Sequence, residues 1–140
     1  MSQSSPRRAS PALLVVGLLS IGVGCSLDRP PSDIALARYS RMQIECYMVA
    51  LDDYKADVGD YPNSREGLQA LRVAPIGKVS WKGPYLQRDV GNDGWGRPFV
   101  YVFPGKHGDK PDIISYGKDG APGGTGANED LTSWSLQTKR

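Results

Sequence analysis

The chain has 140 residues, and 39% of them are hydrophobic, which is enough for the core of one domain. Its 17 Lys and Arg outnumber its 15 Asp and Glu by the two arginines Arg7 and Arg8, because residues 1–24 contain no acidic side chain. The rest of the chain is charge-balanced, which excludes a domain that binds nucleic acid through a basic surface. The 17 glycines and 11 prolines indicate many turns around few regular elements.

The N-terminus is typical of an export signal. An uncharged, mostly apolar run at 11–24 follows the two arginines, and it is too short for a membrane-spanning helix, which needs about 20 apolar residues. The run ends in Gly22-Val23-Gly24-Cys25, which resembles the lipobox of bacterial lipoproteins. We therefore expect a signal peptide at 1–24, a lipid on Cys25, and an exported chain that is anchored in a membrane facing the periplasm. Ser26 after the cysteine favours the outer membrane, by resemblance to enterobacterial lipoproteins.

The two cysteines leave two alternatives open. If Cys25 is lipidated, Cys46 is a lone thiol in a predicted helix, where we expect it to pack rather than react. If Cys25 is not lipidated, a disulfide between Cys25 and Cys46 can form in an oxidising compartment. The sequence does not distinguish these two states.

A long amphipathic helix is predicted after a short tether at 25–32. Pro30 and Pro31 keep any helix from running through the tether, and Ser32 or Asp33 supplies the N-cap. The helix is expected to reach about Asp57, with Gly59 beyond its C-terminus. Its apolar residues recur at steps of three and four, which predicts one buried face: Ile44, Tyr47, Leu51, Tyr54 and Val58, extended by Ala37 and Met48.

The second half of the chain changes to short β-like runs. Asn63 and Glu66 have the spacing of a capping box, which predicts a short helix at 64–72. Three strands are then expected, at 81–86, 99–103 and 112–116, the last two forming a hairpin. The expected class is α+β, in which a long and a short helix pack on a small antiparallel sheet. The polar residues 135–140 predict a disordered tail.

No catalytic motif is found in the sequence. It contains no nucleophile elbow, no zinc-peptidase helix motif and no phosphate-binding loop. His107, the single histidine, is expected to be a solvated loop residue, and nothing places it beside Cys46. We therefore expect a protein that is not an enzyme.

A glycine-rich segment at 117–129 has the composition of a calcium loop. Calcium binds six to eight oxygen atoms, often from Asp side chains and backbone carbonyl groups of a flexible loop. Asp119 lies near the start of the segment, and Asn128, Glu129 and Asp130 lie at its end. Its five glycines allow the backbone to curl so that both ends meet one ion. Residues 89–94 briefly resemble the start of an EF-hand but lack its final Glu, so we interpret them as turns.

Several linked motifs from about residue 33 to 134 resemble the major pseudopilin, protein G, of the type II secretion system. They are ALDDYKADVGDYPNSREGLQAL at 50–71, WKGPY at 81–85, DGWGRPFVY at 93–101, SYGKDG at 115–120 and GGTG at 123–126. The resemblance implies a helical spine on a small antiparallel sheet, followed by a calcium loop. It also implies calcium ligands at Asp119, Asn128 and Asp130. The Tyr116 carbonyl group and Thr125 are the further candidates.

The N-terminus departs from that family. Pseudopilins begin with a short basic leader, then Gly-Phe and a Glu that opens an apolar segment continuous with the spine helix, and these features are absent here. We therefore expect a calcium-stabilised, non-enzymatic domain at 33–134, tethered by lipid and acting in type II secretion through protein partners, with no small-molecule substrate. The alternative is a free-standing exported lipoprotein that binds other molecules with the same fold and has no role in secretion.

Overall fold

The computed structural model describes residues 29–137. The predicted signal peptide lies outside these residues, and so does the first half of the tether, 25–28, which includes Cys25. Among the described residues, no helix combines the length and apolar character needed to cross a bilayer. The elements follow in the order α1 (Asp33–Val58), η1 (Leu68–Leu71), β1 (Val100–Val102), β2 (Asp112–Ser115), η2 (Gly126–Asn128), β3 (Leu131–Thr132) and α2 (Ser133–Gln137).

Both ends of α1 lie where the sequence predicts them. Ser32 is the N-cap, and its hydroxyl oxygen accepts a 3.3 Å hydrogen bond from the amide of Ala35. At the other end Gly59 adopts a left-handed conformation with φ of 98°, and its amide donates to the Lys55 carbonyl group at 2.8 Å. A residue without Cβ adopts this conformation without steric cost, which explains the glycine at the helix C-terminus.

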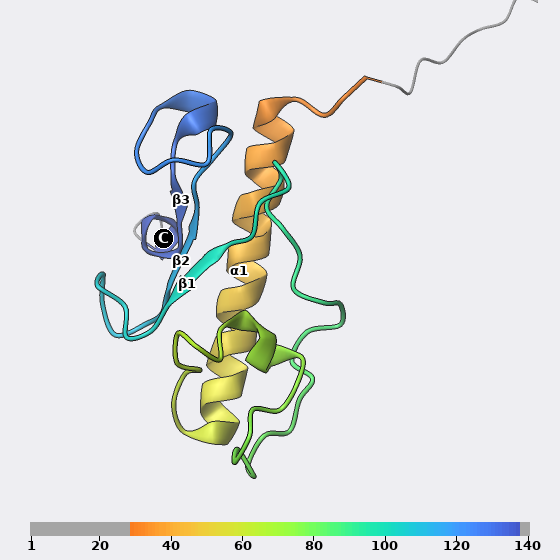
Figure 1. Ribbon diagram of the computed structural model, residues 1–140, viewed down its shortest axis with the longest axis vertical. Coiled ribbons are helices and arrows are strands. Elements are labelled where there is room, and N and C mark those ends of the chain that lie inside the picture. The colour runs from red at the N-terminus through yellow and green to blue at the C-terminus, as the bar shows by residue number, and fades with distance from the viewer. Residues whose placement is uncertain (1–28, 138–140) are drawn as a thin grey trace, which may run out of the picture.

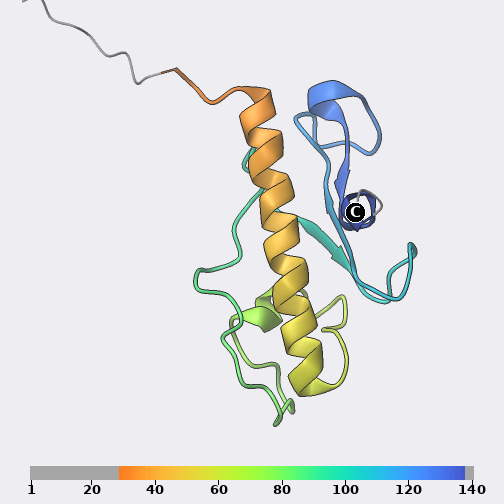
Figure 2. The same ribbon diagram turned by 180° about the vertical axis from the view of Figure 1, so that it is seen from behind.

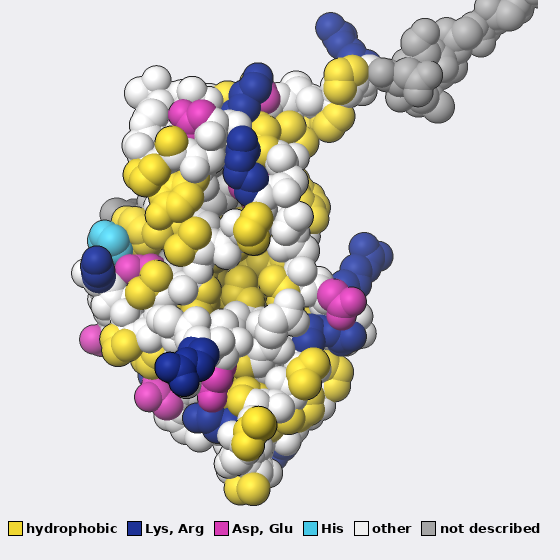
Figure 3. All heavy atoms as spheres, viewed as in Figure 1, with side chains coloured by type: hydrophobic (Ala, Val, Ile, Leu, Met, Phe, Trp, Pro, Cys, Tyr) yellow, Lys and Arg dark blue, Asp and Glu magenta, His cyan; other side chains and the backbone are white. Residues whose placement is uncertain are grey.

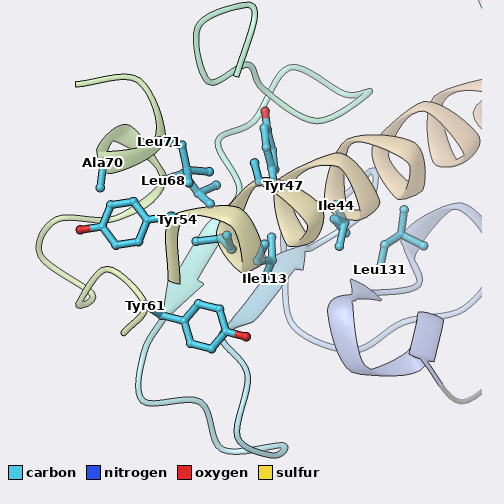
Figure 4. Packing of buried hydrophobic residues seen from close by; sticks show 11 residues of the cluster. Ile44, Tyr47, Tyr54, Tyr61, Leu68, Ala70, Leu71, Ile113 and Leu131 are labelled. Atoms are coloured by element: carbon cyan, nitrogen blue, oxygen red, sulfur yellow. The ribbon is translucent and has the colours of Figure 1, made fainter. Parts of the chain in front are cut away.

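The core lies between α1 and a three-stranded antiparallel sheet of order β1-β2-β3 (Figure 1). β1 and β2 form the predicted hairpin, with Tyr101 opposite Ile113, and β3 pairs with the other edge of β2. Side chains from α1, η1 and the sheet meet in one cluster (Figure 4). Its buried hydrophobic members are Ile44, Tyr47, Ala50, Leu51, Tyr54, Tyr61, Leu68, Ala70, Leu71, Ile113 and Leu131.

The predicted strand at 81–86 is wrong. This segment is irregular, and it contacts η1 and the C-terminal end of α1 instead of pairing with a strand. The indole of Trp81 donates to the Ala70 carbonyl group at 2.8 Å, and the Tyr85 hydroxyl donates to Asp57 at 3.0 Å. Pro84 has no amide hydrogen to donate to a neighbouring strand, which disfavours a strand here. The apolar residues around it pack against η1 and the end of α1 instead.

The helix predicted at 64–72 is shorter than expected. Its capping box is present, because the Asn63 amide donates to Glu66 at 2.9 Å and the Glu66 amide donates to the Asn63 side chain at 3.0 Å. Regular structure begins only at Leu68, as a 3₁₀ helix. Gly67 before it has φ of 59° and ψ of −164°, a conformation outside the helical region, which ends the first turn.

Two further expectations are corrected. The disordered tail does not start at Ser135, because α2 continues to Gln137 and Leu136 packs against the core. Cys46 is exposed, whereas we expected it to pack. The core-facing positions of α1 include Ile44 and Tyr47, and a residue two positions after Ile44 points away from that face.

Candidate functional site

The glycine-rich loop connects β2 to β3 and lies beside the N-terminal end of α1 (Figures 1 and 2). Its two ends are brought together by a 2.9 Å hydrogen bond from the Lys118 amide to the Ala127 carbonyl group. The Lys118 ammonium group also contacts Asp33 in the first turn of α1 at 3.0 Å. Hydrogen bonds from Lys118 and Trp95 lower the pKa of Asp33 below its usual value. The loop is therefore closed on itself and fastened to the helix.

Glycine is required where the loop closes most tightly. Gly124 has φ of 87°, and a Cβ atom there would lie 2.5 Å from the carbonyl oxygen of Asn128. Gly117 has φ of 61°, and its Cβ would lie 2.9 Å from the Ala127 carbonyl oxygen. Gly123 also has a positive φ, 97°, but the space around it is open.

Asp130 has the most distinctive carboxylate of the predicted ligands. Its Oδ2 atom accepts a 3.0 Å hydrogen bond from the Gly123 amide. Its Oδ1 atom is buried and has no hydrogen-bond partner within the described part of the chain. A buried carboxylate oxygen without a partner is costly, and a bound cation would satisfy it. This observation fits a hard metal ion, which prefers oxygen ligands.

The other predicted ligands are spread along the same loop. Asp119 is exposed, and its Oδ1 atom accepts from the Ala121 amide at 3.1 Å. The Tyr116 carbonyl group accepts from the Gly120 amide at 3.1 Å, and the Thr125 carbonyl group accepts from the Asn128 amide at 3.2 Å. Within residues 29–137, no group of three or more His, Cys, Asp or Glu side chains is arranged to hold a metal ion. A cation here would therefore depend on backbone carbonyl and amide oxygens together with Asp119 and Asp130.

Two residues that were not predicted from the sequence, Asp93 and Arg97, support this loop. The Arg97 guanidinium donates to the Gly117 carbonyl group at 3.1 Å, and it occupies the space that a side chain at Gly120 would need. Arg97 is positioned by Asp93, whose buried carboxylate accepts hydrogen bonds from the amides of Trp95 and Arg97 at 3.0 and 2.9 Å. The sequence signal was Asp93-Gly94-Trp95-Gly96, because an Asp at the start of a turn often bonds the backbone two residues on.

His107 is more constrained than a solvated loop residue. Its Nδ1 atom lies 2.9 Å from Oδ2 of the buried Asp112, and its ring stacks on Trp134 with centroids 3.6 Å apart. These contacts join the hairpin loop to α2. The side chain is 44% exposed, and its contacts with Asp112 and Trp134 give His107 a packing role.

Comparison with known proteins identifies a consistent set of relatives. The model of the family described as "Type II secretion system (T2SS), protein G" matches residues 31–134. The type II secretion system core protein G of Pseudomonas aeruginosa is 34% identical over 127 residues, which cover 87% of each chain. That of Klebsiella pneumoniae is 33% identical over 134 residues, which cover 90% of this chain and 92% of the relative. The crystal structure of the major pseudopilin of enterohaemorrhagic Escherichia coli superposes with a TM-score of 0.61 at 29% identity, over 74% of this chain and 90% of that one.

Proposed function

This chain belongs to the protein G family of the type II secretion system, and we propose that it is a periplasmic, non-enzymatic structural subunit of that system. We further propose that calcium stabilises the domain and that a lipid on Cys25 tethers it to a membrane. The family match over residues 31–134 is the observation that best supports the structural role in secretion. The shared fold of a spine helix on a small antiparallel sheet supports the same assignment. In such a role the domain acts through contacts with other components of the secretion system.

Deleting the gene in its own host tests the role in secretion. Loss of exoproteins from the culture medium, restored by the gene on a plasmid, is the expected result. Normal secretion from the deletion strain would instead favour the alternative of a free-standing exported binding module. All other type II secretion genes of the deletion strain must be intact. A second strain that lacks the secretion ATPase shows how much exoprotein remains in the medium when secretion is lost completely.

Calcium is proposed for the glycine-rich loop. Asp119 and Asp130 would supply carboxylate oxygens, Asn128 its amide oxygen, and Tyr116 and Thr125 further oxygen atoms. The unpartnered Oδ1 atom of Asp130 is the observation that supports this site best. A cation bound only by the folded loop stabilises the fold by mass action, by about 2.7 kcal/mol when calcium is at 100 times its dissociation constant.

The melting temperature in calcium and in EGTA tests this site. We expect calcium to raise the melting temperature by at least about 5 °C, since 1 kcal/mol corresponds to about 4–8 °C in a domain of this size. Asp130→Asn and Asp119→Asn should reduce that shift, and Asp109→Asn, in the exposed hairpin loop, should leave it unchanged. An equal melting temperature in calcium and EGTA would exclude the site.

The lipid on Cys25 is proposed from the lipobox-like sequence, and this residue lies outside the described part of the chain. Mass spectrometry of the mature N-terminus should find an acylated Cys25. An intact Met1, or a mature chain beginning with an unmodified residue, would exclude the lipid and return the Cys25–Cys46 disulfide to consideration.

A further inference from the structure

The loop at residues 73–80, which follows η1, presents hydrophobic side chains to solvent. Ile76 is 103% exposed and Val79 is 97% exposed, and no other large hydrophobic side chain among residues 29–137 is as exposed as these two. Val73 is 68% exposed. The loop lies at the opposite end of α1 from Asp33 (Figure 1), and hydrophobic side chains form the lowest point of the molecule in Figure 3. We call residues 73–80 the distal loop.

Two consecutive β-turns direct these side chains outward. The Lys78 amide donates to the Pro75 carbonyl group at 3.2 Å, and the Trp81 amide donates to the Lys78 carbonyl group at 3.1 Å. Ile76 and Val79 are therefore the second residues of the two turns. Polar residues, glycine and proline usually occupy such turns, so two aliphatic side chains at the corners require an explanation.

The base of the distal loop is attached to the core. The Trp81 indole donates to the Ala70 carbonyl group at 2.8 Å, and the Tyr85 amide donates to the Leu71 carbonyl group at 2.8 Å. Within the loop, Gly77 has φ of 81°, the value needed at the third residue of a type II turn. These constraints keep the two aliphatic side chains on the outside of the loop.

The segment that contains the distal loop carries only positive charge. Residues 67–88 include no Asp or Glu, and this is the longest segment without an acidic side chain among residues 29–137. Its basic residues are Arg72, Lys78, Lys82 and Arg88. The most exposed aliphatic side chains of the described structure therefore lie in its longest acid-free segment.

Ion pairs neutralise only two of these four basic charges. Arg72 contacts Asp89 at 3.2 Å, and Lys82 contacts Asp57 at 2.8 Å. The other two basic side chains have no ion pair within the described part of the chain. The end of the domain thus combines exposed aliphatic carbon with cations that are free to meet an anionic surface.

We propose that the distal loop binds the surface of a bilayer that contains anionic lipid. Ile76 and Val79 enter the boundary between the headgroups and the acyl chains, where their burial removes apolar surface from water. Lys78, which lies between them in sequence, contacts lipid phosphate groups. Each basic side chain near an anionic bilayer surface strengthens binding about fivefold.

The shape of the distal loop favours a bilayer over a protein partner. A specific protein interface buries roughly 1,600 Å² and centres on aromatic and arginine side chains that fill pockets. The distal loop instead offers three aliphatic side chains at a projecting end of the domain (Figure 1). A fluid bilayer closes around such a projection, whereas a rigid partner needs a pocket of matching shape.

This contact is separate from the proposed lipid on Cys25. The distal loop and residue 29 lie at opposite ends of α1 (Figure 1). Absence of the lipid would leave the charge and exposure of the distal loop unchanged. Failure of the distal loop to bind a bilayer would equally leave the lipid and the role in secretion unaffected.

A fluorophore in the distal loop tests the proposal. The full chain carries Cys25→Ser and Cys46→Ser, and Ser80→Cys supplies one exposed thiol for an NBD fluorophore. The labelled protein is mixed with vesicles of phosphatidylcholine and phosphatidylglycerol that contain spin-labelled lipid, which quenches a fluorophore inside the bilayer. We expect quenching at position 80. A fluorophore introduced by Asp109→Cys, in the exposed hairpin loop, should not be quenched.

Variants of the distal loop separate the two contributions to binding. Ile76→Ser with Val79→Ser should lower the ratio of bound to free loop at least about tenfold, because the burial of both aliphatic side chains is lost. Lys78→Gln should lower the ratio about fivefold, and vesicles of phosphatidylcholine alone should also weaken binding. The matched control is Met42→Ser with Val49→Ser, which removes two exposed apolar side chains of α1 and should leave the quenching unchanged.

Four results would overturn the proposal. They are the absence of quenching at position 80, equal quenching at position 109, quenching that survives Ile76→Ser with Val79→Ser, and quenching that is equally strong in vesicles of phosphatidylcholine alone. Every variant has the same residues 1–24, so a membrane contact made there cannot produce a difference between variants. Absence of quenching would indicate that the distal loop binds a protein instead.

Discussion

The hydroxyl group of Ser115 donates a 2.6 Å hydrogen bond to Oδ2 of Asp93, and both side chains are buried. Ser115 is the last residue of β2, and Asp93 lies in the turn that positions Arg97. The bond therefore links the sheet to the turn whose arginine supports the glycine-rich loop. The glycine-rich loop therefore depends on Asp93 and Arg97, which are far from it in sequence.

Ser115→Ala should destabilise the domain by about 1.5–3 kcal/mol, the range for a hydrogen bond to a charged group. The Asp93 carboxylate would keep its two backbone donors but lose the donor from the sheet. Urea denaturation measures the change in the free energy of unfolding. Ser135→Ala, at an exposed position of α2, is the control and should cost less. Equal losses in the two variants would contradict the assigned role of Ser115.

Gly124→Ala should destabilise the loop more than Gly123→Ala. Both glycines have positive φ, so both changes incur the same type of backbone strain. Only Gly124 faces the Asn128 carbonyl oxygen, at 2.5 Å from an added Cβ, which adds about 1–3 kcal/mol of overpacking. Denaturation of both variants in EGTA isolates this effect from any bound cation. A larger loss in Gly123→Ala would show that the loop closes differently.

Tyr54→Phe is expected to preserve or increase stability. Tyr54 is fully buried, its hydroxyl group has no hydrogen-bond partner among the described residues, and burial raises its pKa to about 12. Removing an unsatisfied buried hydroxyl group relieves a cost of about 1–3 kcal/mol. The matched control is Tyr61→Phe, which removes a 2.7 Å hydrogen bond to Asp52 and should destabilise by about 1 kcal/mol. Thermal melts should therefore show a lower melting temperature for Tyr61→Phe and an unchanged or higher one for Tyr54→Phe.

Acid should weaken the fold partly through Asp57. Hydrogen bonds from Lys82, at 2.8 Å, and Tyr85 lower the pKa of Asp57 below its usual value. A carboxylate with a lowered pKa in the folded state stabilises the fold above its unfolded pKa, about 3.9, and this contribution is lost as pH falls through the folded pKa. Asp57→Asn should therefore flatten the decline of stability below about pH 4. A variant curve parallel to that of the unchanged protein would contradict this.

The local features of the fold were predictable because they depend on neighbouring residues. The caps of α1 at Ser32 and Gly59, and the pairing of Asn63 with Glu66, involve side chains and backbone groups within one helical turn. The hairpin of β1 and β2 also follows from two short β-like runs separated by a loop. The resemblance of linked motifs predicted the family, which the comparisons confirmed over residues 31–134.

Contacts between residues far apart in sequence determine parts of the fold that the local sequence pattern does not predict. The apolar run at 81–86 resembles a strand by composition, but its Trp81 and Tyr85 donate to Ala70 and Asp57 of earlier elements. Nothing within the run itself specifies those partners. The calcium ligands remain a prediction, since their oxygen atoms are supplied in part by backbone groups whose direction the sequence pattern does not encode.

The sequence by itself determined the elements whose hydrogen bonds and apolar spacing are local: the capped helix α1, its buried face, the hairpin and the positions where glycine is needed. The tertiary structure alone decided that Asp93 and Arg97 support the glycine-rich loop and that Cys46 lies on an uncovered face of α1. The physical reason is that burial and long-range hydrogen bonding depend on which surfaces meet. Helical periodicity specifies that one face of α1 is buried, but it leaves open what covers the opposite face.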